Sequence, residues 1–408
     1  MIVVGGGPAG SGTAIWLAEQ GVSVVLFDRA NFPRDKACGE FLTPQAARLL
    51  RDLGVWEHLM DAGIRPVAAT VLVSPKADGG QMRYAPDDRN VGWAMRRTTL
   101  DAILLARARE AGVAVHEGFA VRSVCREESG SGQQVVGITG KDADGEPHSV
   151  GARLIVGADG THSLIARQLN MVKALPRLQR LAIVAHFRNV SGNGDTIEMR
   201  ASEQTVCGMG FPGGGSSAGN TGHDANLTLV VPTSQASQIA GRAGDFVEQT
   251  LQSKFPLLAE RLAGADREQV VRTVGCYGHR CRPAVADGVL LVGDAATFID
   301  PFTGEGVYFA LRGAQHAAET ASEALRRGDT SRRGLAAYTG ARCELSRRYQ
   351  LLDIVQTVVR TPALLSRAVC RLDRYPAAAA RLFNVLGGTR PPTDVLHPAL
   401  LWRLLAPV

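Results

Sequence analysis

The sequence lacks the features that define several protein classes. Its 408 residues contain seven cysteines but no C-x-x-C pair, which argues against a zinc module, or any other metal site, and fits a chain kept reduced in the cytoplasm. No apolar run approaches the roughly 18 residues that cross a bilayer, and no basic-then-apolar leader opens the chain, so we expect a cytoplasmic protein. Glycine (46) and proline (19) are too few for collagen or low complexity, and 45% hydrophobic residues exclude disorder.

Net charge is also absent from most of the chain. The formal net charge is +6, yet residues 341–408 alone carry ten arginines, no lysine and four acidic residues. These arginines stand singly among apolar residues at helical spacing, which favours a solvated helix face over a nucleic-acid surface. We therefore expect no nucleic-acid partner, while a membrane surface stays open as a partner for this basic tail.

What is present begins with a strand, a glycine-rich turn and a helix. Residues 2–4 form an apolar run, residues 5–10 read Gly-Gly-Gly-Pro-Ala-Gly, and residues 14–19 have helical composition. A second apolar run follows over residues 22–27 and ends at Asp28. This order within one short segment predicts a βαβ unit with a parallel sheet.

The turn matches the dinucleotide-binding pattern G-x-G-x-x-G in the context that the pattern needs. Gly5 allows a tight turn, Gly7 lets the backbone approach a pyrophosphate, and Gly10 lets the helix pack closely on the strand. Pro8 lacks only an amide hydrogen that need not be paired at a helix start. Asp28 follows at the distance where a carboxylate accepts hydrogen bonds from both ribose hydroxyls.

Three later segments complement this turn. Residues 154–160 read Leu-Ile-Val-Gly-Ala-Asp-Gly, and residues 290–296 read Leu-Leu-Val-Gly-Asp-Ala-Ala, each a buried strand that runs into a turn. Residues 301–306, Pro-Phe-Thr-Gly-Glu-Gly, then open a long helix. In this order the segments resemble the flavoprotein hydroxylase superfamily with the p-hydroxybenzoate hydroxylase type of fold. The resemblance covers about residues 1–330 and is nearest to the branch of geranylgeranyl reductases and flavin-dependent halogenases.

The resemblance implies an α/β fold, namely an FAD-binding Rossmann-like βαβ fold with an inserted antiparallel substrate-binding sheet and a C-terminal helical region. Alternating apolar residues over 181–275 are typical of antiparallel strands, and Pro362 and Pro376 predict breaks between C-terminal helices. The implied parts are the FAD-binding segments 1–66, 96–175 and 279–330, the substrate-domain strands 67–95, the substrate-binding sheet 176–278 and the helical region 331–408.

The resemblance also implies how FAD is held. Asp294 would contact the ribityl chain and pyrophosphate, and the helix that starts near Gly306 would set its positive end against the N1/O2 edge of the flavin. Arg97 matches the family arginine that reaches the cofactor. Asp159 and Gly160 match a turn linked to FAD and transient NAD(P)H binding, or else they only end a strand. The expected cofactor-binding residues are Gly5, Gly7, Pro8, Ala9, Gly10, Asp28, Arg29, Arg34, Lys36, Cys38, Gly39, Arg97, Val121, Asp159, Gly160, Gly293, Asp294, Pro301, Gly304, Glu305 and Gly306.

The loop over residues 32–40, Phe-Pro-Arg-Asp-Lys-Ala-Cys-Gly-Glu, resembles the reductase branch, in which it lies beside the flavin. Cys38 and Glu40 are therefore the candidate catalytic residues. The alternative for Cys38 is a small buried thiol. Glu40 is either a proton donor near flavin N5 or a loop carboxylate paired with Arg34 or Lys36. These two basic residues would also offset the charge of the diphosphate.

One strand is expected to cover the substrate. Halogenases carry W-x-W-x-I-P there and prenyl reductases Y-x-W-x-F-P, whereas residues 207–212 read Cys-Gly-Met-Gly-Phe-Pro. Loss of the bulky aromatics predicts an enlarged pocket and disfavours halogenation. His186, mid-strand, is either a satisfied core histidine or a catalytic one. The expected substrate-pocket residues are His186, Cys207, Met209, Phe211 and Pro212.

Three functions follow. The first is an FAD-dependent monooxygenase, fuelled by NAD(P)H, that acts on an apolar aromatic, polyketide or terpenoid small molecule in a dry pocket. The second is an ene reductase of isoprenoid C=C bonds, with Cys38 or Glu40 as proton source and C-terminal helices that contact a membrane peripherally. The third is an FAD-carrying electron-transfer or assembly protein. Because no second nucleotide domain is visible, NAD(P)H should dock on the surface and leave.

Overall fold

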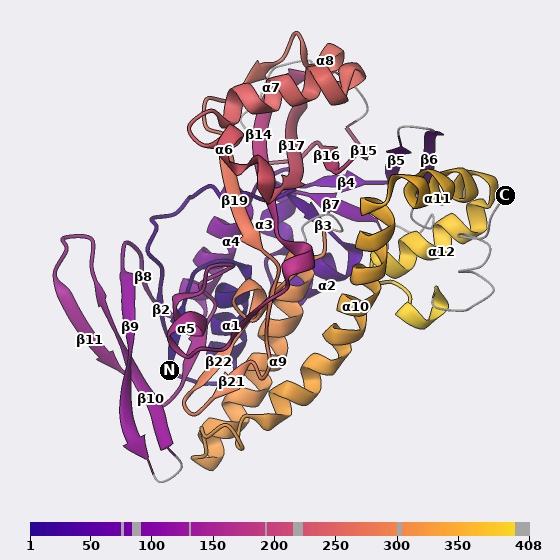
Figure 1. Ribbon diagram of the computed structural model, residues 1–408. Coiled ribbons are helices and arrows are strands. Elements are labelled where there is room, and N and C mark those ends of the chain that lie inside the picture. The colour runs from indigo at the N-terminus through magenta and orange to yellow at the C-terminus, as the bar shows by residue number, and fades with distance from the viewer. Residues whose placement is uncertain are drawn as a thin grey trace.

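The chain forms three regions that lie side by side: a parallel-sheet domain, a second sheet with helices on its outer face, and C-terminal helices that contact both (Figure 1). This arrangement is seen in a computed structural model. It describes residues 1–74, 77–83, 91–129, 132–191, 194–214, 223–299 and 304–395.

The parallel sheet carries the N-terminus and has the strand order β21-β22-β12-β1-β2-β8, in which only the edge strand β21 runs antiparallel to its neighbour. Its central strand β1 pairs in parallel with β12 and β2, so that Val3 lies opposite both Val156 and Leu26. The short apolar runs at the start of the chain and before each later turn are buried here, which confirms the predicted parallel sheet. The strands are β1 (Ile2–Val4), β2 (Val25–Phe27), β8 (Ala114–His116), β12 (Ile155–Gly157), β21 (Val285–Ala286) and β22 (Val289–Leu291).

Helices and smaller sheets surround this parallel sheet. The helix α1 (Pro8–Glu19) packs against α4 (Arg97–Glu110) and α9 (Gly306–Arg327). The buried side of α1 carries small residues, among them Gly12 and Ala14, so α9 can approach it closely. The other elements of this domain are α2 (Pro44–Asp52), α3 (Trp56–Asp61), α5 (Leu164–Gln168), and three small sheets: β9 (Ala120–Ser129), β10 (Gly132–Lys141) and β11 (Pro147–Gly151); β3 (Phe41–Leu42), β4 (Arg65–Val67) and β7 (Gly92–Ala94); β13 (Val172–Ala174), β20 (His279–Cys281) and β23 (Thr297–Phe298).

The second sheet has eight strands in the order β18-β14-β17-β16-β15-β5-β6, with β19 paired to β14. Its pairs are antiparallel, as predicted, except that β15 and β5 run parallel because β5 arrives from an earlier part of the chain. The strands are β5 (Ala69–Ser74), β6 (Ala77–Arg83), β14 (Arg180–Val190), β15 (Thr196–Ser202), β16 (Thr205–Gly210), β17 (His223–Pro232), β18 (Asp266–Arg267) and β19 (Arg272–Tyr277).

Side chains of this second sheet alternate between two faces. The outer face is covered by α7 (Ala243–Lys254) and α8 (Pro256–Leu262), which follow the short α6 (Ala236–Ile239). The inner face presents three rows of residues that run across the strands. We call them the polar row (His186, Asn226 and Gly210), the middle row (Val184, Thr228, Gly208, Met199 and Leu72) and the helix row (Ala182, Val230, Val206 and Ala201).

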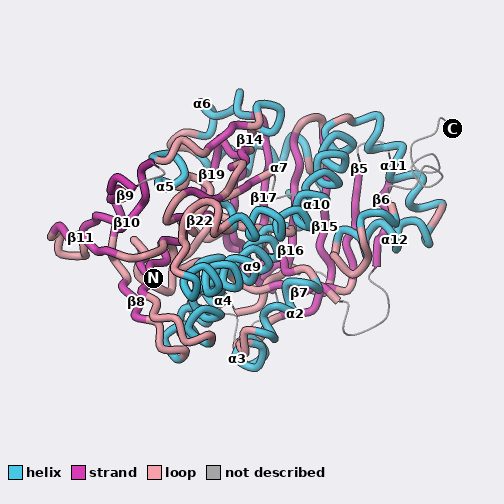
Figure 2. Tube along the Cα trace, turned by 90° about the horizontal axis from the view of Figure 1, so that it is seen from below, coloured by secondary structure: helices cyan, strands magenta, loops and turns pink. Residues whose placement is uncertain are grey.

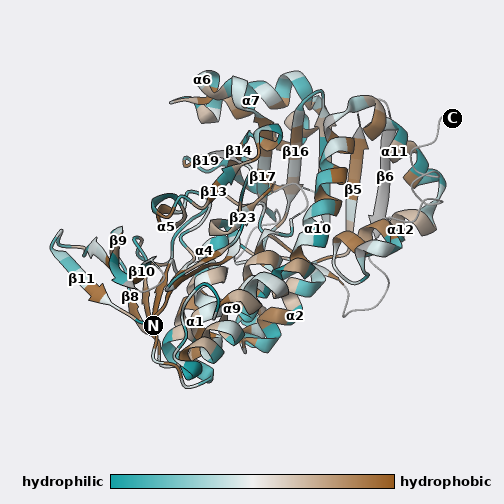
Figure 3. Cartoon of the chain, turned by 60° about the horizontal axis from the view of Figure 1, so that its bottom comes forward, coloured by the Kyte–Doolittle hydropathy of each residue, from teal (hydrophilic) through white to brown (hydrophobic). Residues whose placement is uncertain are grey.

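The C-terminal helices lie against the helix row. Val359 of α10 (Ala336–Arg360), together with Leu365 and Val369 of α11 (Pro362–Arg374), forms one apolar cluster with that row. Figures 2 and 3 show α10 beside β15 and β16, with α11 and α12 (Pro376–Leu386) near β5 and β6. Both predicted proline breaks are confirmed, since α11 and α12 each begin at a proline. Within the described ranges, no helix is long and apolar enough to span a bilayer.

Candidate active site

The glycine-rich turn between β1 and α1 has the geometry that its motif predicts. Gly5 adopts φ +107°, a conformation that favours glycine, and a Cβ at Gly10 would lie 1.7 Å from the Gly5 carbonyl oxygen. The buried Asp28 carboxylate at the end of β2 accepts from Gly6 N at 2.6 Å and from Ala30 N at 2.8 Å. The backbone thus orients Asp28 beside the turn, where we predicted a ribose contact.

Three of the predicted turns meet at this place. A Cβ at Gly5 would lie 2.3 Å from the Ala158 carbonyl oxygen, so the turn after β12 touches the first turn. A Cβ at Gly293 would lie 2.8 Å from Ala9 Cβ, so the turn after β22 abuts the start of α1. Segments far apart in the sequence therefore form one continuous surface at the carboxyl ends of β1, β12 and β22, where α/β folds bind ligands.

Two guanidinium groups face the N-terminus of α1. A Cβ at Gly7, the N-cap residue, would lie 3.4 Å from Arg34 Nη2 and 3.9 Å from Arg97 Nη2. Arg97 donates to both Asp101 oxygens, from Nε at 2.8 Å and Nη2 at 2.6 Å, and Arg34 Nη1 lies 3.0 Å from Asp101 Oδ2. The Asp101 carboxylate is thus the one negative group described here beside two guanidinium groups and the positive end of α1. The first turn of α1 itself contains no acidic residue. A diphosphate fits this excess of positive charge.

The buried Arg97 stays charged at every physiological pH. Burial by itself lowers its pKa, but the Asp101 carboxylate and then the Cys38 side chain raise it more, so that the net shift is upward. Cys38 is half-buried and accepts from Glu40 N, with 3.4 Å between N and Sγ. The predicted thiol therefore belongs to the wall of the cofactor site.

The loop and the late turn are joined by an ion pair. Lys36 Nζ lies 3.5 Å from Asp294 Oδ2, an oxygen that also accepts from Thr161 Oγ1 at 3.3 Å. Asp159 instead caps α5, because its Oδ2 accepts from Leu164 N at 2.7 Å. Burial raises the pKa of Asp159, and its buried Oδ1 has no partner among the described residues.

The remaining predicted cofactor residues are distributed around this surface. Val121 on β9 follows Phe119, whose amide donates to the Asp28 carbonyl, whereas Arg29 is exposed beyond Asp28. A Cβ at Gly39 would lie 4.0 Å from Thr228 Oγ1, so the loop faces the middle row. Pro8, Gly160, Gly304 and Gly306 lie in the turns or helix starts already named, and Pro301 lies outside the described residues.

Glu305 turns away from the loop and toward the C-terminal helices. It is 2% exposed at the start of α9 and accepts from Arg348 Nη2 of α10 at 2.5 Å. The same Arg348 nitrogen donates to the carbonyls of Val385 and Leu386 at the end of α12. Burial raises the pKa of Glu305 to about 7, although Arg348 opposes this shift. One arginine thus ties the segment predicted to hold the flavin edge to two C-terminal helices.

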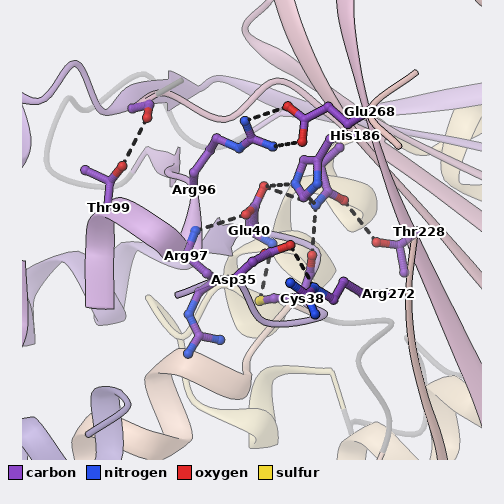
Figure 4. A network of polar contacts seen from close by, with 12 residues as sticks. Asp35, Cys38, Glu40, Arg96, Arg97, Thr99, His186, Thr228, Glu268 and Arg272 are labelled. Atoms are coloured by element: carbon purple, nitrogen blue, oxygen red, sulfur yellow. Dashed lines mark hydrogen bonds and ion pairs between the residues drawn. The ribbon is translucent and has the colours of Figure 1, made fainter. Parts of the chain in front are cut away.

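Glu40 joins the loop to the polar row of the second sheet (Figure 4). Its Oε1 accepts from Arg97 N at 2.9 Å, and its Oε2 lies 2.9 Å from His186 Nε2 and 3.1 Å from Asn226 Nδ2. Asn226 Nδ2 also donates to the Cys38 carbonyl at 2.9 Å. Figure 4 shows the Arg97 backbone nitrogen toward Glu40 and its guanidinium pointing away.

This network corrects one interpretation of Glu40 and settles the place of His186. Glu40 does not pair with Arg34 or Lys36, because these bind Asp101 and Asp294 instead. His186 is 3% exposed and hydrogen-bonded, and it lies at the border between the sheet and the loop. His186 and Glu40 are therefore brought together although their elements are far apart in sequence.

The prediction that five residues line one pocket is wrong for most of them. Cys207, Met209 and Phe211 point to the outer face of the sheet, where they are at most 3% exposed and pack with the apolar side chains of α7 and α8. Pro212 follows β16, beside Gly213, whose amide donates to the Ala94 carbonyl of β7. His186 alone faces inward. Alternation along β16 instead places Gly208 and Gly210 on the inner face.

Several residues of this site escaped sequence reasoning. Asp101 lies four residues after Arg97, a spacing that pairs side chains on a helix and could have been used. Asn226 and Thr228 lie two apart on a strand, which predicts only that they share a face. Arg348 lies in a segment whose arginines we predicted to be solvated, yet it is 7% exposed. Nothing in the sequence around Arg348 indicates that it pairs with Glu305.

The fold and the site define a class that the comparisons with known proteins confirm. The family model described as FAD binding domain matches residues 1–350, so the chain belongs to this family of FAD-dependent oxidoreductases, within the predicted flavoprotein hydroxylase superfamily. It is similar to digeranylgeranylglycerophospholipid reductase 2 of Methanopyrus kandleri, at 31% identity over 350 residues, 83% of this chain and 80% of the relative.

Two further similarities point to halogenating enzymes. The 1H-pyrrole-2-carbonyl-(peptidyl-carrier protein) brominase of Pseudoalteromonas luteoviolacea is 27% identical over 333 residues, 80% of this chain and 77% of that protein. A solved structure of a flavin-dependent brominase triple mutant superposes with a TM-score of 0.80 at 22% identity, covering 98% of this chain and 96% of that chain. At this identity the superposition shows the shared fold alone.

Replacement of Asn226 with leucine tests whether the loop depends on the sheet. The change keeps the side-chain volume but leaves the Cys38 carbonyl without its amide donor and Glu40 Oε2 with one donor fewer, both in a buried setting. We expect the free energy of unfolding to fall by roughly 2–4 kcal/mol in urea titrations. Gln133→Leu, at an exposed amide on β10, is the control and should change it by less than about 0.5 kcal/mol. Equal stability of the two variants would contradict the role of Asn226.

Proposed function

We propose that the protein is a monooxygenase that acts on an apolar aromatic, polyketide or terpenoid small molecule. One oxygen atom of O₂ enters the substrate, the other leaves as water, and NADH or NADPH is oxidised. The observation that carries this proposal is the middle row of the second sheet. Four of its five members are partly exposed, whereas the polar row beside it and the helix row beyond it are buried.

The middle row offers apolar surface and space on the side that faces the loop. A Cβ at Gly208 would meet nothing within 4 Å, and the apolar Met199 lies opposite it, with Leu72 on the strand beyond. The one polar member, Thr228, donates its hydroxyl to Asn226 Oδ1 at 3.0 Å. Such a strip suits an apolar ligand that must be shielded from water while oxygen is transferred.

The predicted proton donors for C=C reduction, Cys38 and Glu40, take part in the hydrogen bonds that hold the loop in place. Each Glu40 oxygen accepts from an N–H group, from Arg97 N on one side and from Asn226 Nδ2 on the other, so Glu40 ties the loop to α4 and to β17. The Cys38 sulfur accepts from Glu40 N within the same loop. These positioning roles of Cys38 and Glu40 support a reaction that needs a dry pocket more than it needs a general acid.

FAD, when bound, supplies the redox chemistry. Arg34, Arg97 and the N-terminus of α1 would hold its diphosphate, and Asp28 its ribose. Glu40 and Asn226 would fix the loop between cofactor and substrate, and α10 would exclude water on the sheet side. A nicotinamide reductant would bind transiently at the surface.

An isotope experiment tests the proposal. The FAD-loaded protein is incubated with NADPH or NADH and a panel of apolar probes, including 2-naphthol and geraniol, under ¹⁸O₂, and products are examined by mass spectrometry. We expect one ¹⁸O atom in the product. Gly208→Phe, which fills the middle row, should reduce turnover at least about 100-fold while FAD stays bound. Products without label, or full activity of Gly208→Phe, would refute it.

A second candidate function, reduction of isoprenoid C=C bonds, is favoured by the similarity to the archaeal digeranylgeranylglycerophospholipid reductase. Peripheral membrane contact of the C-terminal helices belongs to this candidate. The same assay distinguishes the two functions, because reduction proceeds under nitrogen and adds two hydrogens to the product. Turnover of geraniol without O₂ would replace the first proposal with the second.

A further inference from the structure

The inward side of α10 carries a glutamine in an otherwise hydrophobic stripe. Leu345, Tyr349, Leu352, Gln356 and Val359 recur every three or four residues and are all 5% exposed or less. Gln356 is 1% exposed. A helix position of this kind normally holds an apolar side chain.

The Gln356 amide is left unpaired by the protein itself. Its Nε2 and Oε1 atoms are both buried, and neither has a hydrogen-bond partner in the described part of the chain. Within that part, no other side chain has both a nitrogen and an oxygen in this state. Buried polar groups are rarely left unsatisfied, because each lost hydrogen bond destabilises the fold. The Gln356 amide can therefore still donate and accept hydrogen bonds.

The position of Gln356 lies between the parallel-sheet domain and the second sheet. Leu352, one turn before it, packs in the core of the parallel-sheet domain. Val359, three residues after it, packs with the helix row, and Val355 contacts the same cluster, which includes Leu72 of the middle row. Figure 3 shows α10 passing along this face of the sheet. Gln356 thus sits on the helix that borders the partly exposed middle row.

We infer that Gln356 is a substrate-recognition residue, which binds a hydroxyl group on an otherwise apolar ligand lying along the middle row. A hydroxyl donates one hydrogen bond and accepts others, so it can use both atoms of the amide. The stripe residues on either side of Gln356, Leu352 and Val359, are apolar, so the amide is the group of this stripe that would select a phenol or alcohol over a hydrocarbon. The inference rests on the proposed function only in taking this face as the substrate side.

Binding of two matched probes tests the inference without turnover. Equilibrium dialysis of oxidised FAD-loaded protein, with no reductant, is carried out with 2-naphthol and with naphthalene, which lacks only the hydroxyl. We expect wild type to bind 2-naphthol at least about 10-fold more tightly, and Gln356→Met to lose this preference. The control is Gln350→Met, at an exposed position of the same helix, which should keep the preference.

The ligand-free stability provides a second readout. Methionine has a similar length but no polar atoms that need partners, so Gln356→Met is expected to raise the melting temperature by about 2–4 °C. A lower melting temperature would show that the amide is satisfied within the fold, for example by a buried water, and would overturn the inference. Failure of 2-naphthol to bind wild type, or an unchanged preference in Gln356→Met, would overturn it too. Unlabelled product in the ¹⁸O₂ assay would refute oxygen transfer while leaving this binding result standing.

Discussion

Replacement of Arg97 with leucine is expected to yield a colourless protein that has lost FAD. Arg97 is 4% exposed and points its guanidinium at the N-terminus of α1, where it shares the Asp101 carboxylate with Arg34. Its loss removes a charge-assisted contact to the diphosphate, so the dissociation constant for FAD should rise at least about 100-fold. Fluorescence titration of the FAD-free protein with FAD measures this constant.

Two further variants separate cofactor binding from folding. Arg97→Lys keeps the positive charge but not the planar fork that binds Asp101, so we expect a rise of about 10-fold. Arg109→Leu removes an exposed arginine from the same helix and should bind FAD as wild type does. Because Asp101 keeps Arg34 as a partner, Arg97→Leu should still fold. Unchanged FAD affinity in a folded Arg97→Leu protein would refute the assignment of the diphosphate site.

The second large effect is a pH dependence of stability that comes from Glu305. Burial raises its pKa to about 7 from the ordinary value of 4.5. Because the folded state favours the protonated form, the stability that this group contributes is complete below pH 4.5 and is lost as the pH rises through 7. The loss is roughly 3 kcal/mol in the free energy of unfolding.

Comparison with a variant that does not titrate isolates this contribution. Urea titrations of FAD-free wild type and Glu305→Gln are run from pH 4.5 to pH 8. Wild type should lose roughly 3 kcal/mol relative to Glu305→Gln over this range, whereas Glu344→Gln, at an exposed position of α10, should follow wild type. A constant difference between wild type and Glu305→Gln would mean that Arg348 fully compensates the burial of the carboxylate.

The cofactor side of the site could be predicted because short segments of sequence determine its geometry. The turn at Gly5 and the one at Gly293 each combine a buried strand with a glycine at positive φ, where a Cβ would approach a neighbouring segment too closely, and such patterns are visible within about ten residues. Parallel strands also place their carboxyl ends at one edge, so that the meeting of these turns follows from the fold class.

The substrate side could not be predicted in the same way. Alternation shows that Cys207, Met209 and Phe211 share one face of β16, but both faces of this sheet are covered by apolar side chains of helices. The sequence therefore does not say which face looks toward the flavin. The contacts of the loop with the inner face reveal the orientation, among them the one between Glu40 and Asn226, residues 186 positions apart, and pairs so distant leave no local pattern.

The meeting of early and late turns also determines when the cofactor site can form during synthesis. The turn at Gly5 rests on Ala158, and the neighbouring Ala9 rests on Gly293. A nascent chain that ends before Val289 lacks β22 and the turn at Gly293 that forms one wall of the diphosphate site, and Arg348 reaches Glu305 later still. Capture of the cofactor is thus deferred until most of the polypeptide has left the ribosome, and until then the edge of β12 remains unpaired.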